Sequence, residues 1–212
     1  MHTHCLLRID SVCAVFAAAP APSWVAEQLT RIPWVVVRRA QRRDGLVPVG
    51  VRGGTRAERF AGWLRPASVA TWVTPLQLAA RRDWCGRAPR AALAALAALP
   101  GVESIMARCD LATRWGPAGS VAFELASGCA TVTASSDLDL VVQLAAALPA
   151  EEAAALLGEL TQLPVRADVL LETPAGGMAL GEYARARPPY LVRTAQGPRL
   201  LDDPWAAAAA AA

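Results

Sequence analysis

The chain has 212 residues, 54% of them hydrophobic, and a formal net charge of +3, so it can form one large domain or two small ones. All 21 basic residues are arginines, and the absence of lysine excludes a Walker-type phosphate loop, a Schiff-base lysine and a Ser-x-x-Lys nucleophile. The two histidines, His2 and His4, stand at the amino terminus, so a histidine-based catalytic triad is not expected.

The cysteine pattern is typical of reduced thiols in a cytoplasmic protein. The five cysteines are odd in number, widely spread and without a C-x-x-C pair. No window holds 18 uninterrupted apolar residues, so no membrane partner is expected. The Ala-rich stretch 11–22 is short for a signal-peptide core, and Asp10 interrupts the pattern, so secretion is not expected either.

The charge is divided unevenly along the chain. Residues 1–100 carry 14 arginines and five acidic residues, whereas residues 101–212 carry seven arginines and 13 acidic residues. This division suits a basic part that meets an anion and an acidic part that holds cations, and it also fits two halves that simply attract each other. The acidic second half argues against a nucleic-acid partner.

The first half is rich in predicted strands. Thr55 followed by Glu58 has the pattern of a capping box and predicts a helix through Leu64. A short helix is expected at 74–80, and the Arg-rich segment 81–90 is expected to contain the linker, at residues 85–90. Strands are expected at 34–39, 46–52 and 68–73, the first two joined by the turn 41–45.

The second half alternates predicted helices and strands. Pro100 and Gly101 are expected to end a helix that begins at Ala91. After a Gly-rich turn at 115–120, a helix is expected that Gly128 ends in the left-handed conformation. Further helices are expected at 151–163 and 179–187, and strands at 135–142, 165–172, 190–193 and 199–201. The Ala tail at 206–212 has no pattern and fits either a frayed helix or a featureless segment.

These patterns predict an α+β protein with two domains and a cleft between them. Residues 1–84 would form a small β-rich domain, and residues 91–205 a mixed-sheet α/β domain.

Three features of the second half combine into a candidate site. Gly119 and Ser120 open a helix whose free N–H groups can hold a phosphate. Asp137 and Asp139 alternate with leucines in a strand pattern, so both carboxylates would project from one face. Such a pair also fits the solvated face of an edge strand, but hard oxygen ligands suit Mg²⁺. Asp168, on a later strand, can supply a third carboxylate, and a rival, Glu172, lies four residues further on.

This order of residues resembles the nucleotidyltransferase superfamily, in which Gly-Ser is followed by Asp-x-Asp and a third acid. The resemblance implies two Mg²⁺ ions held by Asp137 and Asp139, with Asp168 as third ligand or base. It also implies that Gly119 and Ser120 contact the β- and γ-phosphates of a substrate.

Longer phrases narrow the resemblance to the phosphoribosyl-dephospho-CoA transferase family, which acts as holo-acyl-carrier-protein synthase for malonate decarboxylase. They cover nearly the whole chain. The phrases are VVVRRAQRRDGLVPVGVRG (35–53), TRAERFAGWL (55–64), WGPAGSVAFELASG (115–128), SSDLDLVV (135–142), VRADVLLETPAGGMALGEYA (165–184) and LVRTAQGPRLLDDPW (191–205).

The resemblance implies transfer of the phosphoribosyl-dephospho-CoA group from triphosphoribosyl-dephospho-CoA to a serine of the acyl carrier protein, with release of pyrophosphate. For the basic half we expect Arg38, Arg39 and Arg52 to meet the phosphates, because guanidinium groups match phosphate oxygens. Two alternatives stay open: a nucleotidyltransferase of the same fold with another acceptor, and an inactive nucleotide-binding module. The sequence also leaves open a related carrier system, such as that of citrate lyase.

Overall fold

A computed structural model describes residues 2–41, 43–55, 57–86 and 90–206. The chain divides into two compact units, Met1–Thr74 and Pro75 onward. Each unit contains helices and one six-stranded sheet, so the α+β fold class predicted from the sequence is confirmed. The sequence-predicted limits 1–84 and 91–205 stay predictions, and residues 87–89 of the expected linker and 207–212 of the tail lie outside the described residues.

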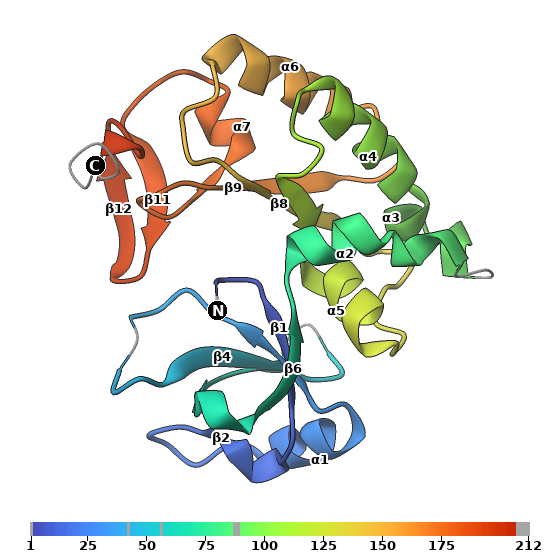
Figure 1. Ribbon diagram of the computed structural model, residues 1–212, viewed down its shortest axis with the longest axis vertical. Coiled ribbons are helices and arrows are strands. Elements are labelled where there is room, and N and C mark those ends of the chain that lie inside the picture. Colours follow the sequence, from blue (N-terminus) through green and yellow to red (C-terminus); the bar gives the residue numbers. More distant parts are fainter. Residues whose placement is uncertain (1, 42, 56, 87–89, 207–212) are drawn as a thin grey trace. The chain divides into compact units, whose positions relative to one another are not determined.

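The first unit is built on a curled antiparallel sheet with the strand order β2-β5-β4-β3-β1-β6 (Figure 1). Its strands are β1 (Leu6–Ile9), β2 (Val15–Phe16), β3 (Trp34–Val37), β4 (Val47–Arg52), β5 (Arg59–Leu64) and β6 (Val69–Val73). Its helices are α1 (Ser23–Arg31) and the short 3₁₀ turns η1 (Val12–Ala14) and η2 (Pro66–Ser68). The predicted hairpin of β3 and β4 is present, with Val36 opposite Gly50.

The core of the first unit is aliphatic and lies between α1 and the sheet. Leu7, Val35, Val49 and Leu64 are almost completely buried in it. From α1, Val25 and Leu29 enter the same cluster. Alternation along β3 and β4 places every second side chain in this core, as a half-buried sheet requires.

The helix predicted from Thr55 to Leu64 is wrong, because residues 59–64 form β5. The Thr55 N–H does donate to the Glu58 carboxylate at 2.9 Å, but this hydrogen bond closes a turn instead of opening a helix. All six residues of β5 then pair with β4, from Arg52 opposite Arg59 to Val47 opposite Leu64. Sheet pairing therefore overrides the local helical signal.

The second unit has a mixed sheet with the strand order β12-β11-β10-β9-β8-β7. The strands are β7 (Trp115–Pro117), β8 (Leu138–Gln143), β9 (Ala167–Glu172), β10 (Gly177–Ala179), β11 (Tyr190–Thr194) and β12 (Gly197–Leu201). The helices are α2 (Pro75–Arg81), α3 (Ala94–Ala97), α4 (Leu99–Arg108), α5 (Gly119–Ser127), α6 (Ala150–Leu160) and α7 (Leu180–Tyr183), with 3₁₀ turns η3 (Asp83–Gly86) and η4 (Arg90–Ala92).

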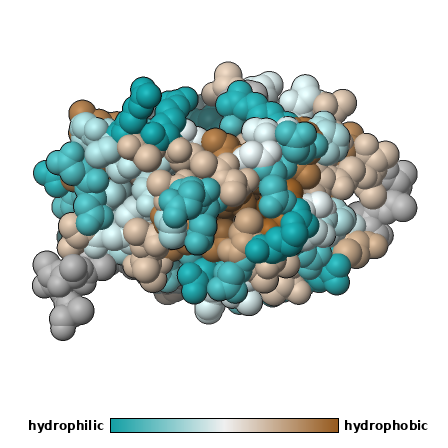
Figure 2. All heavy atoms as spheres, turned by 90° about the horizontal axis from the view of Figure 1, so that it is seen from above, coloured by the Kyte–Doolittle hydropathy of each residue, from teal (hydrophilic) through white to brown (hydrophobic). Residues whose placement is uncertain are grey.

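Helices cover both faces of this second sheet. In Figure 1, α4, α6 and α7 lie on one side of β8 and β9, and α2 and α5 lie on the other. The parallel pair β8 and β9 is joined through α6, since parallel neighbours need a crossover connection. Over the α6 and α4 side, Figure 2 shows hydrophilic residues around a group of hydrophobic ones.

The predicted end of the helix expected from Ala91 is wrong, because Pro100 does not terminate a helix. The chain breaks at Ala98 and starts the new helix α4 at Leu99, with Pro100 in its first turn. Proline is well placed there, because the first turn of a helix needs no N–H donor.

The carboxyl-terminal part differs less from prediction. The β11–β12 hairpin is confirmed, with Leu191 opposite Leu200, whereas the helix expected at 179–187 is only the single turn α7. Trp205 packs on Tyr183 and donates its indole N–H to the Leu144 carbonyl at 3.1 Å, which fastens the end of the described chain to the sheet. Within the described residues, no helix has the length and apolar character needed to cross a bilayer.

Gly116 shows why α2 belongs to the second unit. A Cβ at Gly116 would lie 2.1 Å from the Pro75 carbonyl carbon and oxygen, so α2 packs backbone to backbone on β7.

We expect Gly116→Ala to lower the free energy of unfolding by about 3 kcal/mol, since backbone cannot move aside as a side chain can. Gly158→Ala is the matched control: it lies inside α6 with open space around it, so alanine should raise stability by roughly 0.5–1 kcal/mol. Urea denaturation of both variants measures the difference, and equal effects would refute the backbone contact.

Candidate functional site

The start of α5 packs directly on the carboxylate of Asp139. Gly119 has φ +55°, and a Cβ there would lie 1.9 Å from Asp139 Oδ2. The neighbouring Ala118 N–H donates to the Asp139 carbonyl oxygen at 2.8 Å. Only glycine combines this positive φ with this close approach, so the predicted Gly-Ser turn meets Asp139, the second aspartate of the Asp-x-Asp pair.

Asp139 and Asp168 stand opposite each other on the parallel strands β8 and β9. Opposite residues of neighbouring strands project from the same sheet face, so two carboxylates share one face beside the start of α5. The side chain of Asp168 is 42% exposed, and its Oδ1 accepts from Arg166, with Nε at 3.0 Å. Arg166 is itself largely exposed, so this ion pair is a weak one that a ligand can displace.

Asp137 stands just ahead of β8, which begins at Leu138. A turn positions it: the Thr133 N–H donates to Ser136 Oγ at 3.0 Å, and the Ser136 N–H donates back to the Thr133 carbonyl at 3.1 Å. Asp137 therefore lies between a hydrogen-bonded turn and β8, the strand that contains Asp139.

The strand register separates Asp168 from its rival Glu172. Glu172 stands opposite Gln143, at the other end of β8 from Asp139. Four residues along a strand correspond to roughly 13 Å, so Asp168 and not Glu172 is the near neighbour of Asp139.

The carboxylates form a pair rather than a closed metal centre. Across residues 2–41, 43–55, 57–86 and 90–206, no group of three or more His, Cys, Asp or Glu side chains is arranged to hold a metal ion. The donor set itself is chemically suited to Mg²⁺, because all its members are hard oxygen ligands.

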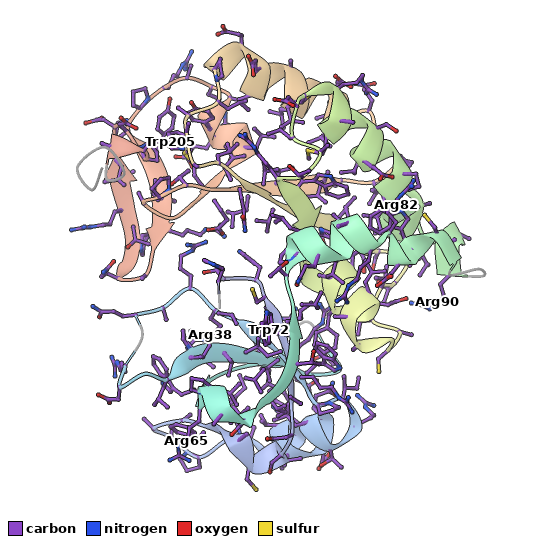
Figure 3. The ribbon with its side chains drawn as sticks, viewed as in Figure 1. Arg38, Arg65, Trp72, Arg82, Arg90 and Trp205 are labelled. Carbon is purple, nitrogen blue, oxygen red and sulfur yellow. The ribbon has the colours of Figure 1, made fainter. Side chains whose placement is uncertain are left out.

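An ion pair between the buried carboxylate of Glu124 and the partly exposed Arg90 fixes the loop before Asp137. Glu124, on α5, is 1% exposed and forms a bidentate salt bridge with Arg90. Arg90 Nε donates to Oε1 at 2.6 Å, and Arg90 Nη2 donates to Oε2 at 2.9 Å. Its Oε2 also accepts the N–H groups of Thr131 and Val132, each at 2.8 Å. Arg90 in turn donates to the Val132 carbonyl at 2.7 Å and lies beside α5 in Figure 3. The loop is thereby tied to α5.

The charge of Glu124 is stabilised inside the protein. Burial alone would raise its pKa, but the hydrogen bonds from Arg90 and from the Val132 and Thr131 N–H groups outweigh burial and hold the pKa below the ordinary value of 4.5. The spacing of residues in the sequence does not predict this ion pair, because its partners are 34 residues apart.

Ser120 is buried at the second position of α5, with an exposed fraction of 6%. Its carbonyl accepts from Thr131 Oγ1 at 3.0 Å, so the same loop also holds the first turn of α5.

The three candidate arginines belong to the first unit. Arg38 lies along β4 and donates from Nε to the Val49 carbonyl at 2.9 Å, and partial burial lowers the pKa of its guanidinium. Arg39 and Arg52 are half-buried and have interactions of their own. Of the three, Arg38 is the one whose guanidinium is bonded to the backbone of β4.

Comparison with known proteins covers both units. The family model described as the phosphoribosyl-dephospho-CoA transferase MdcG N-terminal domain matches residues 2–75, and that of the C-terminal domain matches residues 77–204. No solved structure matches.

Curated relatives agree with the family models. A phosphoribosyl-dephospho-CoA transferase of Azotobacter vinelandii is 42% identical over 91% of this chain and 89% of its own length. The proteins of that name from Pseudomonas aeruginosa and Klebsiella pneumoniae are 40% and 36% identical, over 87% and 95% of this chain and 85% and 95% of their own lengths. These similarities make the chain a transferase. It belongs to the phosphoribosyl-dephospho-CoA transferase family.

We expect Glu124→Gln to lower the free energy of unfolding at pH 7 by about 2 kcal/mol, because charge-assisted hydrogen bonds to a buried carboxylate are lost. The folded-state pKa of Glu124 is depressed, so its contribution is complete above pH 4.5 and is lost as the pH falls through the folded value. Urea denaturation from pH 7 downward should therefore show the wild type and the variant converging in acid.

Glu159→Gln is the matched control, because Glu159 pairs with Arg108 at an exposed position between α4 and α6. It should cost less than about 1 kcal/mol. A loss for Glu124→Gln no larger than that for Glu159→Gln would contradict the assigned role of the buried pair.

Proposed function

We propose that the chain transfers the phosphoribosyl-dephospho-CoA group from 2'-(5''-triphosphoribosyl)-3'-dephospho-CoA to a serine of the malonate decarboxylase acyl carrier protein, in the cytoplasm and with Mg²⁺. The observation that carries this proposal is the pairing of Asp139 with Asp168 beside Gly119. All three lie within the residues that match the family's C-terminal domain.

In the proposed reaction the serine oxygen attacks the α-phosphorus of the donor. A new phosphorus–oxygen bond forms to serine, the bond between the α-phosphorus and the bridging oxygen breaks, and pyrophosphate leaves. The serine proton passes to a carboxylate, for which Asp168 on β9 is the candidate because its side chain is 42% exposed and so within reach of an incoming hydroxyl group. The product is a phosphodiester on the carrier.

Asp137, Asp139 and Asp168 are the proposed Mg²⁺ ligands. Bound Mg²⁺ would neutralise the charge that develops on the phosphate oxygens. The free N–H groups at the start of α5, at Gly119 and Ser120, are proposed to hold the β- and γ-phosphates, as helix N-termini do. Arg38, Arg39 and Arg52 are proposed as further phosphate ligands, and the cleft between the two units stays a prediction.

The test is the mass of the apo carrier protein after incubation with enzyme, donor and Mg²⁺. We expect a mass gain of one phosphoribosyl-dephospho-CoA group, and Asp139→Asn should slow it by about 100-fold or more, the scale on which loss of one charge-stabilising group acts. Asp202→Asn, an exposed acid just beyond β12, is the control that should keep full activity.

No mass gain with the wild type would refute the proposal. Pyrophosphate release from ATP without a carrier would instead favour the alternative nucleotidyltransferase.

The contact of Gly119 with Asp139 predicts a second effect on the same assay. Gly119 and Gly128 both have positive φ, +55° and +75°, but a Cβ at Gly128 meets nothing within 4 Å. Alanine should therefore cost both positions about 1–2 kcal/mol of backbone strain, whereas only Gly119→Ala displaces the Asp139 carboxylate. We expect a transfer rate at least about tenfold lower for Gly119→Ala than for Gly128→Ala, and equal rates would count against the contact.

A further inference from the structure

The first unit contains a pocket that the proposed transfer chemistry does not use. It has a volume of about 270 Å³ and opens between α1 and the segment after β4. This is slightly below the usual range for a whole drug-sized ligand, so it suits one ring system of a larger molecule. Its lining residues are Trp24, Glu27, Gln28, Arg31, Gly53, Gly54 and Glu58.

Gln28 supplies a fixed donor in this pocket. Its side chain is buried, with an exposed fraction of 8%. Its Oε1 accepts from Arg31 Nη2 at 2.6 Å, which sets the orientation of the amide. No hydrogen bond within the described part of the chain uses Nε2, so the pocket wall offers an amide donor with no protein acceptor.

Glu58 supplies a fixed acceptor. Its Oε2 accepts the Thr55 N–H, and the Glu58 side chain lies so close to Gly53 that a Cβ there would meet Glu58 Cβ at 2.4 Å and Oε2 at 2.7 Å. The second carboxylate oxygen is left to accept a further bond. Trp24 adds a flat apolar wall, half-buried against the core of the unit.

The charge of the pocket selects against phosphate. Residues 1–74 contain ten arginines and four acidic residues, yet two of those four acids, Glu27 and Glu58, line this pocket beside one arginine. A phosphate would face a net negative wall, whereas an uncharged ring with its own donors and acceptors would not.

We propose that this pocket binds the adenine base of the donor. Adenine presents an amino donor next to a ring-nitrogen acceptor, which complements the Glu58 carboxylate and the Gln28 amide, and its ring can stack on Trp24. The inference rests on the proposed function for the identity of the donor, but base binding itself requires no transfer reaction.

The test is equilibrium binding of adenosine to the full chain by isothermal titration, with inosine as the paired probe. Inosine carries an oxo acceptor where adenosine has the amino donor, so it should bind at least about tenfold more weakly. Loss of stacking in Trp24→Leu should weaken adenosine binding by about tenfold, and loss of the donor in Gln28→Leu by a similar factor. Thr30→Ala, on α1 but not in the pocket lining, is the matched control and should bind normally.

Thermal unfolding of each variant shows whether it is folded. Where Trp24→Leu fails to fold, Glu58→Gln and Gln28→Leu carry the test. No adenosine binding at millimolar concentration, equal binding of inosine, or undiminished binding by the folded pocket variants would each overturn the inference. Adenosine binding that depends on these residues without any mass gain on the carrier would support the pocket and refute the proposed function.

Discussion

The contact between Gly119 and the Asp139 carboxylate is the constraint on which the candidate site depends. The first residue of α5 lies against Asp139, the second residue of β8, and the adjacent Ala118 N–H donates to the Asp139 carbonyl. Helix start and strand therefore cannot move independently. Because Asp168 is held opposite Asp139 by the parallel register, the same contact fixes where the second carboxylate stands relative to α5.

The ion pair of the buried Glu124 with Arg90 extends this constraint to the loop ahead of Asp137. A carboxylate that is almost completely buried is tolerated only where several donors surround it, and here a guanidinium and two backbone N–H groups do so. Those backbone groups belong to the loop, so the hydrogen bonds that stabilise the charge of Glu124 also fix the path of the chain between α5 and β8. The hydrogen bonds of a buried carboxylate thus help to position the chain that leads to the acidic residues of the candidate site.

Sequence patterns predicted the elements whose signals are local. Gly128 ends α5 at φ +75°, and the β11–β12 hairpin forms around the expected turn. Prediction was wrong where a local signal competed with a distant partner: the Thr55–Glu58 hydrogen bond forms, but β5 pairs with β4 and no helix follows. The choice between Asp168 and Glu172 needed the register of two strands, and the ion pair between Arg90 and Glu124 needed a contact between distant segments; neither is readable from spacing alone.

The charge of the first unit is not uniform over its surface. The first unit is basic as a whole, which suits a polyphosphate donor. Within it, the Glu27 and Glu58 pocket is locally acidic, so the unit has surfaces of two different charges. A nucleotide whose base and phosphates differ in charge would be oriented by that contrast, because each end is disfavoured at the surface that suits the other. Orientation by repulsion requires no extra contact with the reacting phosphorus, so in the proposed reaction the carboxylates of β8 and β9 would be left to the chemistry.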